Sequence, residues 1–199
     1  MRTLANFVLF QLAWFAAVAG ADAGSEAVRT WAGPLAVLVF LAVHLAMIDG
    51  ARERTRELVF VLAVGLVGGA VDSVLRALAI TAYPTSTESA LVPPWIASLW
   101  VAFAMLPRFS LAWLRGRPVL AGVLGAIGGP LSYLAGTRFG AVAVGSSATV
   151  TWVVLAVQYA TFTPLILRLA PASAAPDAFA VPDRSSRDVP VAAAEEVGP

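Results

Sequence analysis

The stretch that decides the fold is residues 119–140, VLAGVLGAIGGPLSYLAGTRFG, which is long and apolar enough to cross a bilayer. Its small residues recur at steps of three and four and therefore share one helix face; they are Gly122, Gly125, Gly129, Ser132, Gly136 and Gly140. In water such a helix would be poor, because each interior glycine costs about 1 kcal/mol relative to alanine. In lipid the same face lets a neighbouring helix approach closely, so the stretch predicts a transmembrane helix buried among others.

The composition extends this prediction to the whole chain. Hydrophobic residues make up 59% of the sequence and charged residues 13%, against about 25% charged residues in soluble domains. The net charge of +1 gives no basic surface for nucleic acid. The chain has no cysteine and one histidine, which excludes thiolate and multi-histidine metal sites within one chain. We therefore expect a multi-pass membrane protein that holds neither a metal nor a cofactor.

Six apolar segments have the length that a bilayer requires, which predicts an all-α, polytopic helical bundle. The predicted spans are residues 3–21, 31–48, 58–78, 93–114, 118–137 and 146–167 of a domain covering 1–170. Residues 49–57, DGARERTRE, read as an aqueous loop, and Pro107 with Arg108 predicts a kink or break in the fourth span. Residues 171–199 are rich in Ala, Pro, Ser, Asp and Arg without an apolar period, which predicts a disordered tail.

The arginines predict the orientation, because arginine collects on the cytoplasmic side of a membrane. With the N-terminus inside, the inner segments hold Arg2, Arg52, Arg54, Arg56, Arg115, Arg117, Arg168, Arg184 and Arg187, and the outer segments hold Arg29 and Arg138. Both termini are therefore expected in the cytoplasm. The first span, with Arg2 before it and small residues after it, also fits a secretory signal peptide, but Asn6, Gln11 and Trp14 interrupt its apolar core and favour a retained helix.

Polar side chains inside the spans are the candidate site residues, because a charge at the bilayer centre is costly and faces the bundle interior. Four of them share one depth in the outer half, and a fifth lies on the polar face of the sixth span; the expected ligand-binding residues are Asp72, Arg76, Ser132, Tyr133 and Gln158. An inner polar layer consists of Asn6, Gln11, His44 and Arg108. The alternative is structural: Asp72 and Arg76, one turn apart, neutralise each other, and His44 is a hydrogen-bonded interior residue.

Glycine faces on two spans predict which helices touch. The helix-packing residues are Gly65 and Gly69 on the third span and Gly125, Gly129 and Gly136 on the fifth. We expect these two spans to pack together, with Asp72 in reach of Ser132 or Tyr133. His44 and Asp72 differ in depth by more than about 10 Å at 1.5 Å per residue, so a Ser–His–Asp relay is not expected.

Several segments together resemble the domain of unknown function 2878 family, over residues 6–167. They are MRTLANFVLFQLAWFAAVAGA, the helix of Asp72, PPWIASLWVAFA, and SLAWLRGRPVLAGVLGAIGGPLSYLAGTRFGAV. The resemblance implies an integral protein of a bacterial inner membrane, and it implies no reaction. It marks as positions of interest Asn6, Gln11, Trp14, Asp72, Trp95, Trp100, Pro130, Ser132, Tyr133 and Gly136.

The residues leave three functions open, all with the lipid bilayer as a partner. The first is a carrier or binder of a small or lipidic molecule. The second is an intramembrane lipid-modifying enzyme, with Asp72 as general acid or base and Tyr133 as proton donor. The third is an accessory or assembly subunit whose glycine faces dock a partner membrane protein. The absence of a metal-ligand cluster or a recognisable nucleophile in the sequence weakens the enzyme hypothesis.

Overall fold

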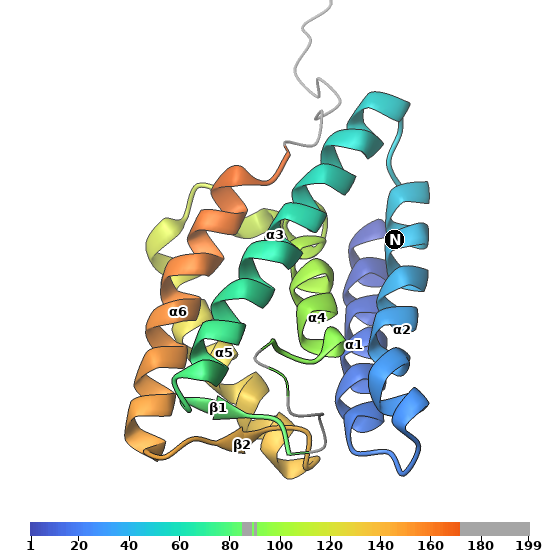
Figure 1. Cartoon of the computed structure of the whole chain (residues 1–199). Coiled ribbons are helices and arrows are strands. Elements are labelled where there is room, and N and C mark those ends of the chain that lie inside the picture. Colours follow the sequence, from blue (N-terminus) through green and yellow to red (C-terminus); the bar gives the residue numbers. More distant parts are fainter. Residues whose placement is uncertain (85–88, 90, 172–199) are drawn as a thin grey trace, which may run out of the picture.

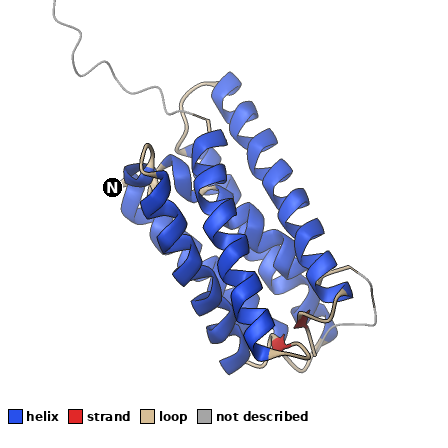
Figure 2. Cartoon of the chain, turned by 90° about the vertical axis from the view of Figure 1, so that its left-hand side faces the viewer, coloured by secondary structure: helices blue, strands red, loops and turns tan. Residues whose placement is uncertain are grey.

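The computed structural model describes residues 1–84, 89 and 91–171, and it is a bundle of helices (Figures 1 and 2). The helices are α1 Arg2–Ala21, α2 Glu26–Ala46, α3 Ala51–Ala77, α4 Pro94–Ala104, α5 Pro118–Arg138 and α6 Ala148–Leu169. Two 3₁₀ turns, η1 Leu106–Arg108 and η2 Ala112–Leu114, connect α4 to α5. The predicted all-α bundle is confirmed, and within the described residues five helices are long and apolar enough to cross a membrane. The predicted disordered tail begins at Pro171, and residues 172–199 lie outside the described residues.

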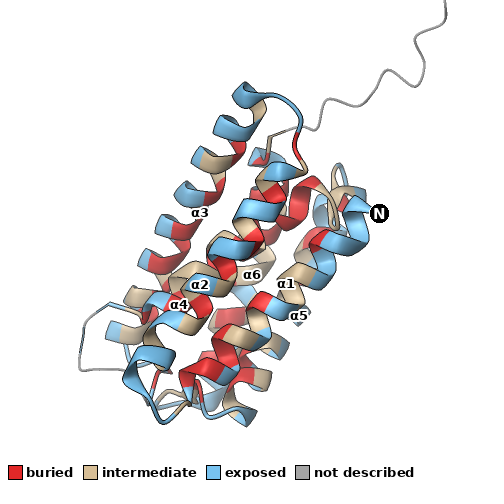
Figure 3. Cartoon of the chain, turned by 90° about the vertical axis from the view of Figure 1, so that its right-hand side faces the viewer, coloured by how far each residue is buried: buried red, intermediate tan, exposed pale blue. Residues whose placement is uncertain are grey.

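The outer surface of the bundle is apolar, as expected for a surface that faces lipid. Large hydrophobic side chains project outward from the five long helices; Leu66, for example, is 77% exposed. Figure 3 shows this pattern, with exposed residues along the outer faces of the helices and buried residues along their inner faces. Soluble monomers rarely expose contiguous apolar surface of this extent, so the burial pattern agrees with a membrane protein.

The helices form two groups that are joined at one end. Helix α4 packs against α1, α2 and α3, whereas α5 and α6 pack chiefly against each other. The two-residue strands β1 (Thr81–Ala82) and β2 (Ala143–Val144) pair antiparallel and link the end of α3 to the start of α6. We call this the hairpin end of the bundle, and we call the opposite end, which holds the N-terminus and the end of α6, the arginine end (Figure 1).

Helices α2 and α3 both begin earlier than the sequence predicts. Helix α3 starts at Ala51, so most of the predicted loop 49–57 forms its first two turns. Arg and Glu are good helix formers, and Arg56 pairs with Glu53 three residues earlier at 2.9 Å, which stabilises these turns. Helix α2 starts at Glu26, so Pro34 lies inside the helix and not at its beginning.

The fourth predicted span is not one continuous helix. Helix α4 has 11 residues and is therefore about 16 Å long, which is too short for a hydrocarbon core of about 30 Å. It ends at Ala104, and Pro107 lies in the 3₁₀ turn that follows, as the predicted break requires. Arg115 then donates hydrogen bonds to the carbonyl oxygens of Pro107 and Ala170, which hold the irregular segment against the end of α6.

The predicted packing of the two glycine faces against each other is wrong. The face on α3 lies against α4, where Gly68 meets the ring of Trp100 and Gly65 meets Val101. The face on α5 lies against α6, where Gly125 and Gly129 meet the backbone and the ring of Tyr159. The α3 face is therefore filled by Ala97, Trp100 and Val101 of α4, and the α5 face is filled chiefly by Tyr159 of α6. Small residues predict a close approach, but they do not identify the helix that approaches.

Candidate functional site

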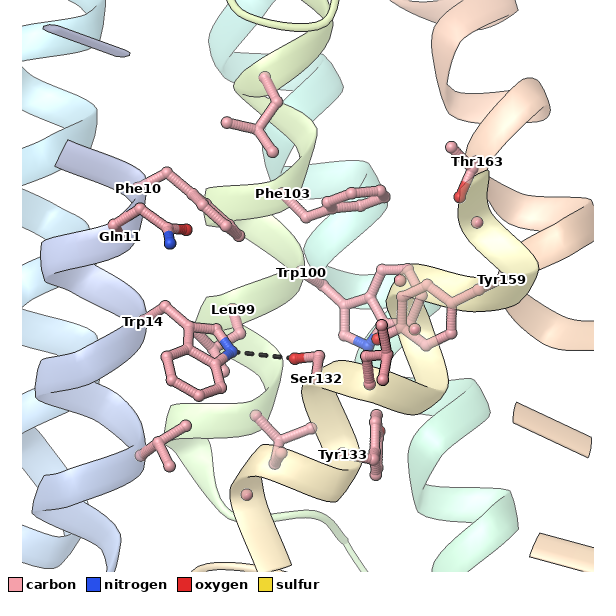
Figure 4. Close-up of a pocket in the computed structure, with 18 of the residues that line it drawn as sticks. Phe10, Gln11, Trp14, Leu99, Trp100, Phe103, Ser132, Tyr133, Tyr159 and Thr163 are labelled. Carbon is pink, nitrogen blue, oxygen red and sulfur yellow. Dashed lines mark hydrogen bonds between the residues drawn. The ribbon is translucent and has the colours of Figure 1, made fainter. Parts of the chain in front are cut away.

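A cavity of about 470 Å³ lies inside the bundle, between α1, α4 and α5, with two residues of α6 in its wall (Figure 4). Most of its lining is aliphatic and aromatic, and its wall reaches the outer surface at Phe15 and Leu131, which are 49% and 56% exposed. A cavity of this size, lined by apolar residues and few polar groups, has the properties of a small-molecule site.

The two helices that flank the cavity, α1 and α5, are held together across it by a tryptophan. Trp14 Nε1 donates to Ser132 Oγ at 3.0 Å, and this is the one hydrogen bond between α1 and α5 in the described part of the chain. The ring of Trp14 also lies edge-on to Phe139 with 6.3 Å between centroids. Figure 4 shows Gln11 and Trp14 on one side of the cavity and Ser132 on the other.

Asp72 of α3 also lines the cavity, and its hydrogen bonds join α3 to α4, α5 and α6. Its carboxylate accepts from Trp100 Nε1 at 2.8 Å, from the Tyr133 hydroxyl at 2.9 Å and from Gln158 Nε2 at 2.9 Å. Asp72 is 1% exposed, and it points inward because it continues the α3 face that begins with Gly65 and Gly69. Among the residues that the structure describes, no cationic side chain forms an ion pair with this carboxylate.

The structure separates the five predicted ligand-binding residues into three places. Asp72, Tyr133 and Gln158 meet, so the expected contact between Asp72 and Tyr133 is confirmed. Ser132 faces α1 across the cavity, because neighbouring positions on a helix point about 100° apart. Arg76 turns to the hairpin end, where it donates to the Leu91 carbonyl at 2.7 Å, and the predicted ion pair with Asp72 is not formed.

Arg76 belongs to a small aromatic group that covers the hairpin end of the Asp72 cluster. Its guanidinium lies 5.7 Å from the centroid of the Tyr83 ring. Tyr83 in turn meets Trp95 edge-on at 5.9 Å. Burial raises the pKa of the Tyr83 hydroxyl, so this side chain stays neutral at physiological pH. The group closes the cluster on the side away from the arginine end.

Three of the four predicted inner residues meet in a second buried cluster, at the arginine end. Asn6 Nδ2 lies 3.2 Å from His44 Nδ1, His44 Nε2 lies 2.9 Å from Glu57 Oε1, and Arg108 donates to Glu57 Oε2 at 2.9 Å. Asn6 and His44 have no exposed surface, and Glu57 has 1%. The fourth predicted residue, Gln11, lies more than a turn further along α1 and lines the cavity.

The hydrogen bonds of this cluster orient the Asn6 amide and the His44 imidazole. Asn6 Nδ2 donates to the Met105 carbonyl, and Asn6 Oδ1 accepts from the Ser110 hydroxyl at 2.6 Å, which sets the orientation of the amide. The Asn6 nitrogen is then a donor toward His44 Nδ1, so Nδ1 is an acceptor and Nε2 carries the proton. His44 Nε2 therefore donates to Glu57, whose other carboxylate oxygen accepts from Arg108.

Sequence reasoning missed Glu57, because the acidic and basic run 49–57 looks like a loop in water. A signal for its burial was nevertheless present. The inward face of α3 can be followed backward from Asp72 in steps of three and four residues through Gly69, Gly65 and Val61 to Glu57. Helical periodicity, continued past the end of the apolar run, would have placed Glu57 inside the bundle.

Among the residues with a described position, the geometry assembles no Ser–His–Asp relay. His44 contacts Glu57 and Asn6, the Ser110 hydroxyl donates to Asn6 and not to the imidazole, and Asp72 belongs to the other cluster. At the cavity wall, among the described residues, Asp72 and Tyr133 form a hydrogen-bonded pair that can exchange a proton. The site therefore offers binding, with a carboxyl–phenol pair as its acid–base chemistry.

Comparison with known proteins is informative at the level of the family. Neither the curated proteins nor the solved structures contain a match to this chain. The family model described as "Protein of unknown function (DUF2878)" matches residues 3–165, a range that includes both polar clusters and every helix except the first residue of α1 and the last residues of α6. The chain therefore belongs to the DUF2878 family of proteins.

Proposed function

We propose that this protein binds a small hydrophobic or lipidic molecule within the membrane, in the cavity between α1, α4 and α5. The observation that carries the proposal is the apolar cavity of about 470 Å³ inside a membrane-spanning bundle. Pockets that bind small molecules have volumes of roughly 300–1,000 Å³. A lipid chain or a molecule of similar size fits this range.

A few polar atoms in the cavity wall favour a ligand with one polar group. Thr163 lines the cavity and is 4% exposed as a residue, and its hydroxyl, buried beside Gly125, has no hydrogen-bond partner among the described residues. A buried hydroxyl without a partner costs free energy, so a ligand hydroxyl or carbonyl at this point would gain a hydrogen bond. Ser132 offers a second oxygen on the wall near α1.

The outer opening of the cavity favours entry from the bilayer. Phe15 and Leu131, which line the cavity, are exposed on the lipid-facing surface, and α1 and α5 are linked there by the Trp14–Ser132 bond. A hydrophobic ligand that dissolves in lipid therefore reaches the cavity without passing through water. This supports binding or carriage of a lipidic molecule more than transport of a polar solute.

A second candidate is an enzyme that acts on a lipid held in the same cavity. It is favoured by the hydrogen bond between Asp72 and Tyr133 at the cavity wall, since a carboxyl group and a phenol can act as general acid and base. The third function considered, docking of a partner membrane protein through glycine faces, has less support, because those faces are filled by α4 and α6.

We further infer that the protein lies in a bacterial inner membrane with its N-terminus and the end of α6 in the cytoplasm. The arginine end holds Arg2, Arg52, Arg54, Arg56, Arg108, Arg115, Arg117 and Arg168, whereas Arg29, Arg76 and Arg138 lie at the hairpin end. Alkaline phosphatase fused after Pro84 should be active, and fused after Arg117 it should be inactive. The reverse pattern contradicts this orientation.

The binding proposal is tested by filling the cavity. Gly128 lines it, and a Cβ there would meet nothing within 4 Å, so Gly128→Phe should occupy the space without disturbing the bundle. We expect a ligand with bromine-labelled acyl chains to quench the fluorescence of Trp14 and Trp100 in the purified protein. Gly128→Phe should abolish this quenching. Leu66→Phe, on the lipid-facing surface, is the control and should behave like wild type.

A second pair of variants separates binding from catalysis. Thr163→Val, which replaces the hydroxyl with a methyl group, should weaken binding of a hydroxylated ligand about fivefold, the equivalent of one hydrogen bond of about 1 kcal/mol. Asp72→Asn should leave the lipid composition of the host membrane unchanged if the protein only binds its ligand. If a lipid species that disappears on deletion of the gene returns with wild type but not with Asp72→Asn, the enzyme is favoured.

A further inference from the structure

We propose that a second site, a groove at the arginine end between the start of α5 and the end of α6, binds an anionic phospholipid. The groove has a volume of about 480 Å³ and is separate from the cavity described above. Its lining comes from the turn that precedes α5, from the first residues of α5, and from the last two turns of α6. Arg117 and Arg168, one on each side, are its charged residues.

The two arginines are available to a ligand. Neither Arg117 nor Arg168 forms an ion pair or a side-chain hydrogen bond with any residue that the structure describes, and the lining of the groove contains no acidic residue. Arg115, two residues before Arg117, differs because its guanidinium is used by the carbonyl oxygens of Ala170 and Pro171. The groove therefore carries two positive charges without a described counter-charge.

The start of α5 adds hydrogen-bond donors at the same place. The helix begins at Pro118, and no side chain caps it. The backbone N–H groups of Val119 and Leu120 in its first turn point toward the arginine end, as N–H groups do at the start of a helix. The positive end of the helix dipole favours an anion there. A phosphate that bridges Arg117 and Arg168 would lie close to these donors.

The walls of the groove identify the source of the phosphate as a lipid. Below the arginines they consist mainly of Ala121, Pro164, Leu165 and Leu167, and Leu165 is 45% exposed. A soluble phosphate gains nothing from such walls, whereas an acyl chain covers them and excludes neighbouring lipid. Basic pockets between helices are a known mode of anionic lipid recognition. The headgroup thus lies at the arginines and one acyl chain lies along α6.

The test uses the purified full-length protein and two lipids with identical acyl chains, phosphatidylglycerol and phosphatidylcholine, with binding measured by native mass spectrometry. We expect phosphatidylglycerol to bind at least tenfold more tightly, since each arginine near a membrane surface contributes severalfold to the attraction of an anion. Arg117→Gln with Arg168→Gln should remove that preference. Arg138→Gln, at the other end of α5, is the matched control and should keep it.

A second variant tests the acyl chain by itself. Leu165→Trp keeps both arginines and fills the groove, so it should reduce phosphatidylglycerol binding about tenfold with unchanged elution on gel filtration. The proposal is overturned if the two lipids bind equally, or if the double arginine variant keeps the wild-type preference. Glycerol phosphate binding as tightly as phosphatidylglycerol would overturn the assignment to a lipid.

Discussion

Replacement of Glu57 by glutamine tests the buried ionic cluster at the arginine end. The change keeps the shape of the side chain and removes its charge. Glu57 accepts from His44 Nε2 and from Arg108 Nη1, each at 2.9 Å. The glutamine amide has one oxygen for these two donors, so its NH₂ group must face the other donor. The tautomer of His44 cannot change to relieve this, because Asn6 donates to Nδ1.

The cost follows from the burial of the cluster. The side chains of Glu57 and Arg108 are 1% and 5% exposed, and removal of one partner of a buried ion pair costs about 3–5 kcal/mol. For a chain of this size each kcal/mol lowers the melting temperature by roughly 2–4 °C. We therefore expect Glu57→Gln to unfold roughly 6–20 °C below wild type, measured by tryptophan fluorescence during heating in detergent at pH 7.

The matched control is Glu53→Gln, the same change one turn earlier on the same helix. Glu53 pairs with Arg56 at the surface, where the side chains are 26% and 53% exposed, and such pairs contribute about 0–1 kcal/mol. The double change of Glu57→Gln with Arg108→Gln should recover much of the stability, because no lone charge remains. If the melting temperatures of Glu57→Gln and Glu53→Gln agree within about 1 °C, the reasoning is refuted.

Two further predictions concern helix packing. Gly129→Ala should destabilise the protein by about 1–3 kcal/mol in thermal unfolding, because the new Cβ would overlap the ring of Tyr159. The control, Gly128→Ala, places its Cβ in open space and should be neutral or slightly stabilising. Equal melting temperatures for the two variants would contradict this packing. Cysteines at Gly69 and Ala97 should crosslink under mild oxidation in this cysteine-free chain, because a Cβ on Gly69 lies 3.1 Å from that of Ala97. A crosslink between cysteines at 69 and 129, without one between 69 and 97, would instead support direct packing of α3 against α5.

The sequence was sufficient for the fold class and for the direction in which many side chains point. Hydrophobic length identifies the long spans, because every span must cover the same thickness of hydrocarbon. Helical periodicity turns Asp72 inward, and depth along a helix brings Asp72 and Tyr133 to one level. These three inferences succeed because they use only the position of a residue along its own helix and the thickness of the membrane. None of them depends on how the helices are arranged around one another.

What could not be predicted is the choice of neighbours. Gly69 and Gly129 each allow a close approach, but the sequence does not say that Ala97 and Tyr159 are the residues that fill those places. The direction of Ser132 depends in the same way on the position of α1. The burial of Glu57 depends on Arg108, which lies 51 residues later in the chain. Pairing of this kind is determined by the whole bundle and leaves little trace in any local pattern.

The short helix α4 has a consequence for the way this protein is made. Asn6 reaches its membrane position early in synthesis, but its partners at Met105 and Ser110 are 99 and 104 residues later. At about 5–20 residues per second, the ribosome needs about 5–20 s to produce them. In that interval α2 and then α3 supply His44 and Glu57. Because α4 is too short to cross the bilayer by itself, it inserts into a space that α1, α2 and α3 have already enclosed. The helices of this half of the bundle therefore assemble in the order in which they are synthesised.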